Sequence, residues 1–428
     1  MLQQSDAISH YGMDSILTTI FAIALFITLY FEVFLLLTYF ENRKLFERRG
    51  VAPRCGAEAP MPSVTVIVPC WNEETTLAQT VQSLQALEYP KDKIQIFIIN
   101  DGSTDGTAQV AQPLLADPRV KYFYKENGGK HSALNLGIKE SETDLIGCLD
   151  ADSFVKPCAL SRIAHVFNDP SVMAVTAAIK VFEPKTVIQR MQDTEYTIGI
   201  LFKKILSCMN AQYVTPGPFS IYRRSIFDQI GLFGHAHGTE DLEMALRMHS
   251  KHLRIENVFD AEVYTVAPST VGALLRQRLR WIYGFIKNAM DYRFMIGRKK
   301  YGNLGMFSLP AALISLVVLL YAVFFLLWNT VGYIAQKTLQ VATVGFPQLG
   351  NIDFDWFFVN TETVSLVAIE SMVLFGIILV LGVYRVRGRL NFKINDAYFV
   401  GLYGLIAPIW TARAVLRLFS SVPVKWWR

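Results

Sequence analysis

The chain has 428 residues, 52% of them hydrophobic, a formal net charge of +5 and a mean hydropathy of +0.29. This composition is too apolar for an ordinary cytosolic enzyme, and the length leaves room for more than one domain. The positive charge is concentrated beside apolar segments, which indicates membrane topology and argues against a nucleic-acid partner. We therefore expect a lipid bilayer as a partner of this chain.

The first membrane-spanning segment is predicted at residues 16–40. It is apolar apart from Glu32 and long enough to cross a bilayer. Residues 1–15 lack Lys and Arg and are expected outside the cytoplasm, whereas the basic linker at 41–62 places the exit of the span in the cytoplasm. Glu32 is expected to snorkel, to pack against another helix or to line a path.

A cytosolic α/β domain is predicted for residues 63–270. Runs rich in β-branched residues at 64–68, 94–99 and 145–149 are typical of buried strands, and the segments between them have helical periodicity. Alternating strands and helices predict a mostly parallel sheet that binds ligands at the carboxyl ends of its strands. Residues 186–207 are predicted to form an amphipathic helix, either on the membrane or on the surface of the domain.

Acidic residues follow two of these predicted strands. Asp150 and Asp152 flank one small residue, so their carboxylates can converge on a divalent cation and its bound diphosphate, or can cap the next helix. Asp101 ends another strand and is predicted to bind a ribose or base, or to form an Asx turn. Lys130 follows two glycines before a helix, where its ammonium and the glycine amides can bind phosphate.

A second polar group lies further along the chain. A sugar hydroxyl that attacks an anomeric carbon needs a carboxylate as general base, and a departing diphosphate needs cations. Asp241 and Arg280 are candidates for these roles, and Trp281 offers a flat face for a sugar ring. Alternatively, the acids cap a helix and the arginines bind lipid headgroups. His235 and His237 are interpreted as part of a loop that closes over substrate, with a metal pair as the alternative.

The last third of the chain is dominated by apolar segments. Residues 271–295 are predicted to form an amphipathic interface helix, with one face toward lipid and the other toward a site. Spans are predicted at 304–328 and 364–384, separated by an extracytoplasmic loop at 329–363 that is poor in basic residues. The apolar helix at 397–419 is short, so it is either a fourth span or a re-entrant or interfacial helix.

The cysteines show no metal-binding spacing. They all lie in the segment assigned to the cytosol: Cys55, Cys70, Cys148, Cys158 and Cys208. We therefore expect reduced, structural thiols.

Five short motifs occur in a fixed order: VPCWNE at 68–73, NDGSTD at 100–105, DAD at 150–152, TED at 239–241 and QRLRW at 277–281. Together they resemble glycosyltransferase family 2, in particular its membrane-integrated synthases of cellulose, chitin, hyaluronan and poly-N-acetylglucosamine. The resemblance covers roughly residues 64–288. It implies a GT-A-like domain between transmembrane helices and an inverting transfer from a nucleotide-diphosphate sugar, with Mg or Mn as cofactor.

The resemblance also implies roles for individual residues. Asp241 would be the catalytic base, with Glu240 beside it. Asp152 and Asp150 would hold the metal, and Trp281 would stack on the acceptor sugar. The nucleotide and its diphosphate would be held by Asp101, Glu73, Lys130, Asp150, Gln277, Arg278 and Arg280.

The leading hypothesis is a multi-pass protein of the inner or plasma membrane with a cytoplasmic catalytic domain. It would elongate a β-linked polysaccharide from a UDP-sugar, with UDP-N-acetylglucosamine as the first choice, and pass the product through the membrane. The alternatives are a non-processive transferase that adds one sugar to a lipid acceptor, and a scaffold that only binds sugar nucleotide. Three clear spans are few for a self-contained channel, so a homo-oligomer or an accessory export subunit is considered as a further partner.

Overall fold

A computed structural model of the chain describes residues 2–47, 61–345 and 363–419. By its internal contacts the chain divides into two compact units. One comprises residues 1–37 and 311–379, and the other comprises residues 38–310 and 380–428. The basic linker predicted at residues 41–62 lies largely outside the described residues.

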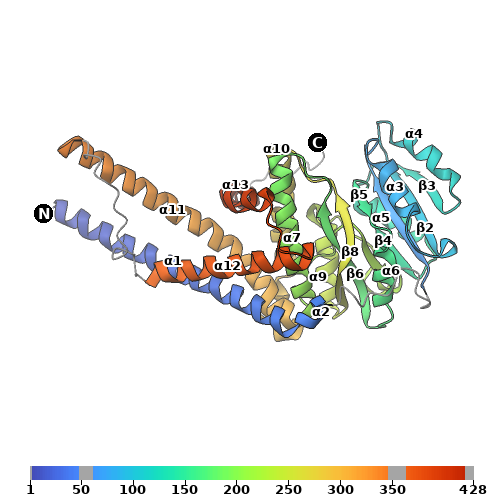
Figure 1. Cartoon of the computed structure of the whole chain (residues 1–428), viewed down its shortest axis with the longest axis horizontal. Coiled ribbons are helices and arrows are strands. Elements are labelled where there is room, and N and C mark those ends of the chain that lie inside the picture. Colours follow the sequence, from blue (N-terminus) through green and yellow to red (C-terminus); the bar gives the residue numbers. More distant parts are fainter. Residues whose placement is uncertain (1, 48–60, 346–362, 420–428) are drawn as a thin grey trace. The chain divides into compact units, whose positions relative to one another are not determined.

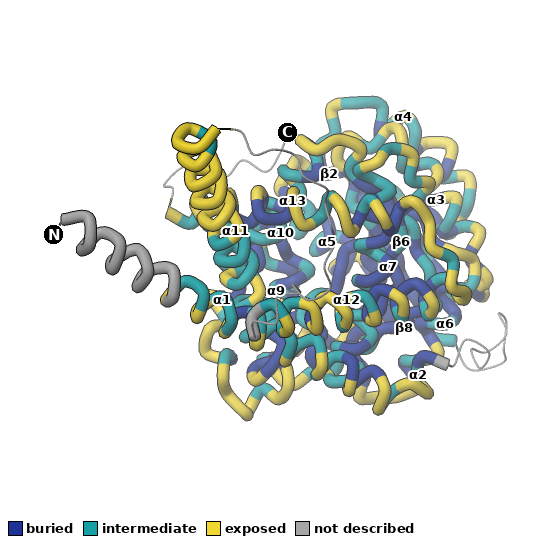
Figure 2. The backbone as a smooth tube through the Cα atoms, turned by 60° about the vertical axis from the view of Figure 1, so that its left-hand side comes forward, coloured by how far each residue is buried: buried dark blue, intermediate teal, exposed yellow. Residues whose placement is uncertain are grey.

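Four helices in the described part of the chain are long and apolar enough to cross a membrane. These segments are Ile16–Glu41, Leu304–Val344, Ser365–Arg387 and Ile394–Leu418. They belong to α1 (Leu2–Glu41), η7 with α11 (Leu304–Ser308 and Leu309–Val344), α12 (Thr363–Arg387) and α13 (Ile394–Leu418) (Figure 1). Much of α11 is exposed (Figure 2), as expected of a helix whose side chains face lipid.

Helix α11 continues to Val344, although the sequence predicts an extracytoplasmic loop from residue 329. Residues 329–344 are therefore helical and do not form an irregular loop, which agrees with their lack of proline. Their predicted extracytoplasmic location stays a prediction. Hydroxyl groups of this stretch also bond within the helix: Thr330 and Thr338 each donate to a carbonyl one turn earlier, at 2.7 and 2.8 Å. The rest of the predicted loop, residues 346–362, lies outside the described residues.

Helices α1, α11 and α12 contact one another within the first unit. The rings of Phe21 and Phe325 stack with centroids 4.3 Å apart, which joins α1 to α11. Ser371 of α12 donates a hydrogen bond of 2.8 Å to Glu32 of α1. Of the three roles expected for Glu32, packing against another helix is therefore the one that the structure shows.

The second unit is built on an eight-stranded sheet with the strand order β3-β2-β1-β4-β7-β6-β8-β5 (Figure 1). The strands are β1 (Val64–Cys70), β2 (Ile94–Asp101), β3 (Val120–Lys125), β4 (Leu145–Cys148), β5 (Ser153–Val155), β6 (Val172–Val181), β7 (Ser220–Arg223) and β8 (Arg254–Thr265). The first four strands pair in parallel, as do β6 and β8, whereas β7 and β5 run antiparallel to their neighbours. The predicted mostly parallel α/β sheet is confirmed.

Helices cover both faces of this sheet. Because side chains alternate along a strand, Val66 and Val68 of β1 pack on one face and Ile67 packs on the other. The first face is covered by α3 (Leu77–Gln85), α4 (Thr107–Ala111) and α6 (Ala159–Val166). The second is covered by α5 (Lys130–Lys139), α8 (Ser225–Ile230) and α9 (Glu240–Ser250). Burial on both faces explains why these strands are apolar throughout.

Helices α7 (Val187–Cys208) and α10 (Val271–Asp291) join the sheet to α13. Helix α7 packs on β6 and β8 and also contacts α13, which in turn contacts α10 (Figure 1). The helix predicted at 186–207 therefore has protein on more than one side. Shorter helices complete the described chain: α2 (Arg43–Glu47), η2 (Lys91–Lys93), η3 (Gln112–Ala116), η4 (Ala236–Gly238), η5 (Arg293–Met295) and η6 (Lys299–Tyr301).

Three cysteines of the second unit, Cys70, Cys148 and Cys208, are free thiols. This agrees with the expectation from the sequence.

Candidate active site

The acidic residues predicted from the sequence meet at one edge of the sheet. Strands β1 and β2 pair in register, with Cys70 opposite Asn100, and β4 lies on the other side of β1. The carboxyl ends of these three parallel strands therefore lie side by side. Glu73, Asp101 and Asp150 follow or end them, which is where open α/β sheets bind their ligands.

Asp101 is buried and holds the loop that leads into α5. Its carboxylate accepts hydrogen bonds from the amides of Gly128 and Gly129, at 3.0 and 2.8 Å. The ammonium of Lys125 lies 2.5 Å from the same carboxylate. A buried carboxylate requires such partners, so the prediction that these glycine amides face a phosphate is wrong in this structure. The prediction that Asp101 binds the nucleotide remains untested.

Lys130 joins the two acidic motifs. Its Nζ lies 2.5 Å from Asp150 Oδ1 at the end of β4 and 3.5 Å from Glu240 Oε1 at the start of α9. Burial alone would lower the pKa of this ammonium, but the surrounding carboxylates, led by Asp150, raise it. Gly217 lies against this pair, since a Cβ there would stand 2.5 Å from Lys130 Nζ. A side chain at this position would have to displace the Lys130 ammonium and the Asp150 carboxylate.

Asp152 lies beside Asp150 in a crowded acidic environment. Its Oδ1 accepts bonds from the hydroxyls of Ser153 and Thr265, at 3.1 and 3.4 Å. Burial, together with repulsion from Asp150 and Glu73, raises the pKa of Asp152 to about 7. Across the described ranges there is no group of three or more His, Cys, Asp or Glu side chains arranged to hold a metal ion.

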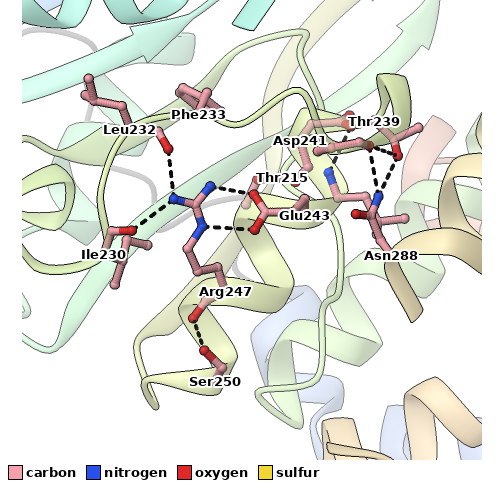
Figure 3. Close-up of polar contacts among 12 residues, drawn as sticks. Thr215, Ile230, Leu232, Phe233, Thr239, Asp241, Glu243, Arg247, Ser250 and Asn288 are labelled. Atoms are coloured by element: carbon pink, nitrogen blue, oxygen red, sulfur yellow. Dashed lines mark hydrogen bonds and ion pairs between the residues drawn. The ribbon is translucent and has the colours of Figure 1, made fainter. Parts of the chain in front are cut away.

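Asp241 lies in the first turn of α9 (Figure 3). Its backbone carbonyl accepts hydrogen bonds from the amide and the hydroxyl of Thr215, at 3.3 and 2.7 Å. Burial, with Glu240 next to it, raises the pKa of Asp241 to about 6. A carboxylate with such a pKa is well suited to accept a proton near neutral pH.

Helix α10 presents a polar face to the start of α9, as the sequence predicts. Arg280 Nη1 donates to the Gly238 carbonyl at 3.0 Å, and the Asn288 amide donates to Thr239 Oγ1 at 2.9 Å (Figure 3). Gly284 lies between them, where a Cβ would stand 2.3 Å from Thr239 Oγ1. Sequence reasoning missed Asn288, although it lies two turns of helix beyond Arg280.

Replacing Gly284 with alanine is expected to lower turnover at least tenfold while the protein still folds. The added methyl group would displace Thr239 and with it the first turn of α9, and small displacements of catalytic groups are costly. Gly272→Ala on the same helix is the control, because its nearest contact would be the side chain of Arg276 at 3.8 Å. Initial rates of the two variants in one sugar-transfer assay check this, and equal rates would contradict it.

The remaining residues of the QRLRW motif have different surroundings. Gln277 Oε1 is buried and has no hydrogen-bond partner within the described parts of the chain, which suits a group that awaits a ligand. Arg278 is buried and forms an ion pair of 2.8 Å with Glu195 of α7. The ring of Trp281 lies against Arg278, with 4.2 Å between the guanidinium carbon and the ring centroid. Within this motif, Arg280 thus contacts the segment before α9, whereas Arg278 and Trp281 contact each other and Arg278 pairs with α7.

The two histidines before α9 have separate partners. His237 Nε2 lies 2.9 Å from Asp291 of α10, whereas the ring of His235 meets that of His131 edge to face at 5.5 Å. The backbone at Ala236 and His237 has positive φ angles of 46° and 55°, which is strained for residues other than glycine. This geometry is more consistent with a shaped loop than with a metal pair.

Known proteins are similar to this chain in sequence and in fold. Residues 65–231 match the family model described as glycosyl transferase family 2. The poly-beta-1,6-N-acetyl-D-glucosamine synthase of Staphylococcus aureus (strain COL) is 31% identical over 228 residues, which are 52% of this chain and 55% of that protein. The synthase of the same name from Staphylococcus epidermidis is 29% identical over 264 residues, or 61% and 63% of the two chains. The chain thus spans little more than half the length of these relatives.

A solved structure agrees over most of the chain. A mannosyltransferase from Pyrobaculum calidifontis, in complex with GDP-Man and Mn2+, superposes with a TM-score of 0.61 at 18% identity. The superposition covers 95% of this chain and all of that one. At this identity the likeness concerns the fold. The sheet and its strand-end acids therefore define a GT-A-like α/β domain.

Residues 65–231 are thus similar to glycosyl transferase family 2, and the resemblance predicted from the motifs is confirmed over this segment.

Proposed function

We propose that the chain is a membrane-embedded inverting glycosyltransferase. Its donor would be a UDP-sugar, with UDP-N-acetylglucosamine as the first candidate, and its acceptor the end of a growing β-linked polysaccharide. The names of the two staphylococcal relatives support both choices. The four apolar helices support a location in the membrane.

The observation that carries this proposal is the position of Lys130 between the two acidic motifs. One ammonium lies 2.5 Å from Asp150 and 3.5 Å from Glu240, although 90 residues separate these acids in the sequence. Donor-binding acids at a strand end and a candidate base at the start of α9 therefore share one site. A transferase needs this arrangement, because both substrates must meet there.

In the proposed reaction, Asp241 accepts the proton of an acceptor hydroxyl. The hydroxyl oxygen then attacks the anomeric carbon of the donor from the side opposite to UDP. The new glycosidic bond forms as the bond between that carbon and the phosphate oxygen breaks, so the configuration inverts and UDP departs. Lys130, Arg280 and Gln277 are proposed to bind the charge and the oxygens of the departing diphosphate.

Magnesium or manganese is proposed as the cofactor, and the residues fit it. Glu73, Asp150 and Asp152 crowd together, and burial with mutual repulsion raises the pKa values of Glu73 and Asp152. One or two carboxylates together with substrate phosphates are a common ligand set for magnesium, so Asp152 and Asp150 would hold the ion. When bound, it would neutralise charge on the diphosphate.

Activity is expected to fall as the pH drops below about 6. The base must be ionised to accept a proton, and the pKa of Asp241 is raised to about 6. Well below this value, the fraction of enzyme with an ionised Asp241 falls about tenfold for each pH unit, and kcat/KM should fall with it. The logarithm of kcat/KM plotted against pH between 4.5 and 8 checks this. A profile that is flat through pH 6 would contradict the assignment of the base.

We further propose that the catalytic domain faces the cytoplasm of a multi-pass protein in the inner or plasma membrane. Basic residues follow α1 and surround the end of α12, and such clusters favour the cytoplasmic side. A second copy of the chain or an accessory export subunit would complete the path for the product.

A panel of labelled UDP-sugars supplied to the purified protein tests the function. A long product from one donor, degraded by a linkage-specific glycosidase, is the expected result. Products that stop at one added sugar and extract into organic solvent would favour a lipid acceptor and contradict processivity. No transfer from any UDP-sugar would contradict the proposal as a whole.

A further inference from the structure

Arg278 of the QRLRW motif is not open to a diphosphate in this structure. Its side chain is only 8% exposed, and its Nη2 lies 2.8 Å from Glu195 Oε2 of α7. A buried ion pair of this kind is costly to break, because the remaining charge would lose its partner. The Nη2 end of the guanidinium is thus paired with a protein carboxylate, whereas the buried Nε has no hydrogen-bond partner among the described residues.

Arg278 instead supports the neighbouring aromatic ring of α10. The two residues are three positions apart, so they share a face of the helix, and the guanidinium carbon lies 4.2 Å from the centroid of the Trp281 ring. Planar stacking of this kind is a property of arginine that lysine lacks. Trp281 remains partly exposed. Arg278 therefore contacts one side of the ring and leaves another part of it accessible to a ligand.

The carboxylate that holds Arg278 is itself contacted from α13. The hydroxyl of Tyr403 lies 3.4 Å from Glu195 Oε1. About two turns before Tyr403, Asn395 donates a hydrogen bond of 2.8 Å to Asp193 of α7. These polar contacts join α13 to the part of α7 that contains Glu195, the partner of Arg278. Helices α7, α10 and α13 therefore meet at the buried ion pair between Arg278 and Glu195.

We propose that Arg278 is a positioning residue for the acceptor sugar. The chain Tyr403, Glu195 and Arg278 fixes the plane of the Trp281 ring, so the docking of α13 sets the platform on which the acceptor stacks. This inference rests on the proposed function, in which Trp281 binds the acceptor. It assigns Arg278 to the acceptor side of the site and not to the donor diphosphate.

Arg278→Lys tests this assignment, because it keeps the charge near Glu195 and removes the planar stacking surface. With a soluble oligosaccharide acceptor, we expect the acceptor KM to rise about tenfold, with the dissociation constant of UDP, measured by calorimetry, changed less than twofold. Arg276→Lys, at an exposed position of the same helix, is the matched control and should change neither quantity. A weaker affinity for UDP with an unchanged acceptor KM would overturn the proposal.

Tyr403→Phe is a milder variant that removes only one hydroxyl from the network. Its acceptor KM should rise in the same direction but less, about threefold, again with UDP affinity retained. An unchanged acceptor KM in this variant would contradict the role of α13.

A measurement without substrate separates this inference from the proposed function. With 5-fluorotryptophan incorporated, the fluorine signal of Trp281, assigned by its loss in Trp281→Phe, should broaden or shift in Arg278→Lys and Tyr403→Phe but not in Arg276→Lys. If wild-type protein transfers no sugar, the proposed function fails even where these signals move. If it transfers sugar and the signal does not move, only the positioning role fails.

Discussion

Replacing Asp241 with asparagine is expected to lower turnover by about 10² to 10⁴, the usual contribution of a positioned general base. The amide keeps the shape of the side chain but cannot accept the proton of the acceptor hydroxyl. Local structure should be retained, because Thr215 bonds to the backbone carbonyl of Asp241 and not to its carboxylate. Initial rates of sugar transfer by wild type and variant measure the effect.

Binding of UDP distinguishes the possible reasons for such a loss. If Asp241 is the base, Asp241→Asn should bind UDP as wild type does. The substitution removes the negative charge of the Asp241 carboxylate, and burial already disfavours that charge in wild type. Asp228→Asn, at an exposed position of α8, is the control and should leave both turnover and binding unchanged. Full turnover in Asp241→Asn would contradict the assignment of Asp241 as the base. UDP binding without any transfer by wild type would instead indicate a protein that only binds sugar nucleotide.

The parts of the site that the sequence predicts depend on local patterns. Apolar runs such as residues 94–99 identify buried strands. A residue such as Asp101, two positions after this run, is therefore expected at the end of the strand, and it is the last residue of β2. Helical periodicity likewise places Arg280 and Gly284 on one face of α10, and the structure directs both toward the segment before Asp241. The spacing of apolar residues and the direction of a strand are local properties of the sequence, so they can be predicted before the fold is known.

The parts that the sequence does not predict depend on contacts between distant segments. Gly217 matters because Lys130 and Asp150 lie against it, and no local pattern indicates that approach. The pairing of Arg278 with Glu195 joins residues 83 positions apart. Such partners are set by the packing of both α7 and α10 on α13, so a motif can identify a residue correctly and still leave its partner unknown.

The length of α11 shows a different limit. Hydropathy marks where a helix stops being apolar, and the sequence prediction ended the span at residue 328. The helix continues to Val344, because its backbone hydrogen bonds do not depend on apolar side chains. The boundary of an apolar segment and the boundary of a helix are therefore separate quantities.

Asp152→Asn is expected to abolish metal-dependent transfer, with a loss of about 10³ in turnover if the ion supplies several kcal/mol to the departing diphosphate. The same substitution should stabilise the protein when no metal is added. The pKa of Asp152 is raised to about 7, so the folded state binds this proton more tightly than the unfolded state, and stability is lost as the pH rises through 7. An uncharged side chain does not suffer this loss.

Melting temperatures at pH 8, with and without manganese, test both halves of this prediction. Without metal, Asp152→Asn should melt at a higher temperature than wild type. Manganese should raise the melting temperature of wild type, because a ligand that binds the folded state stabilises it, and should leave the variant unchanged. Asp228→Asn should respond to manganese as wild type does. If manganese stabilises Asp152→Asn as much as wild type, the ion binds elsewhere. A variant that is more stable without metal but less active with it would show that the Asp152 carboxylate destabilises the folded protein and is needed to bind the metal.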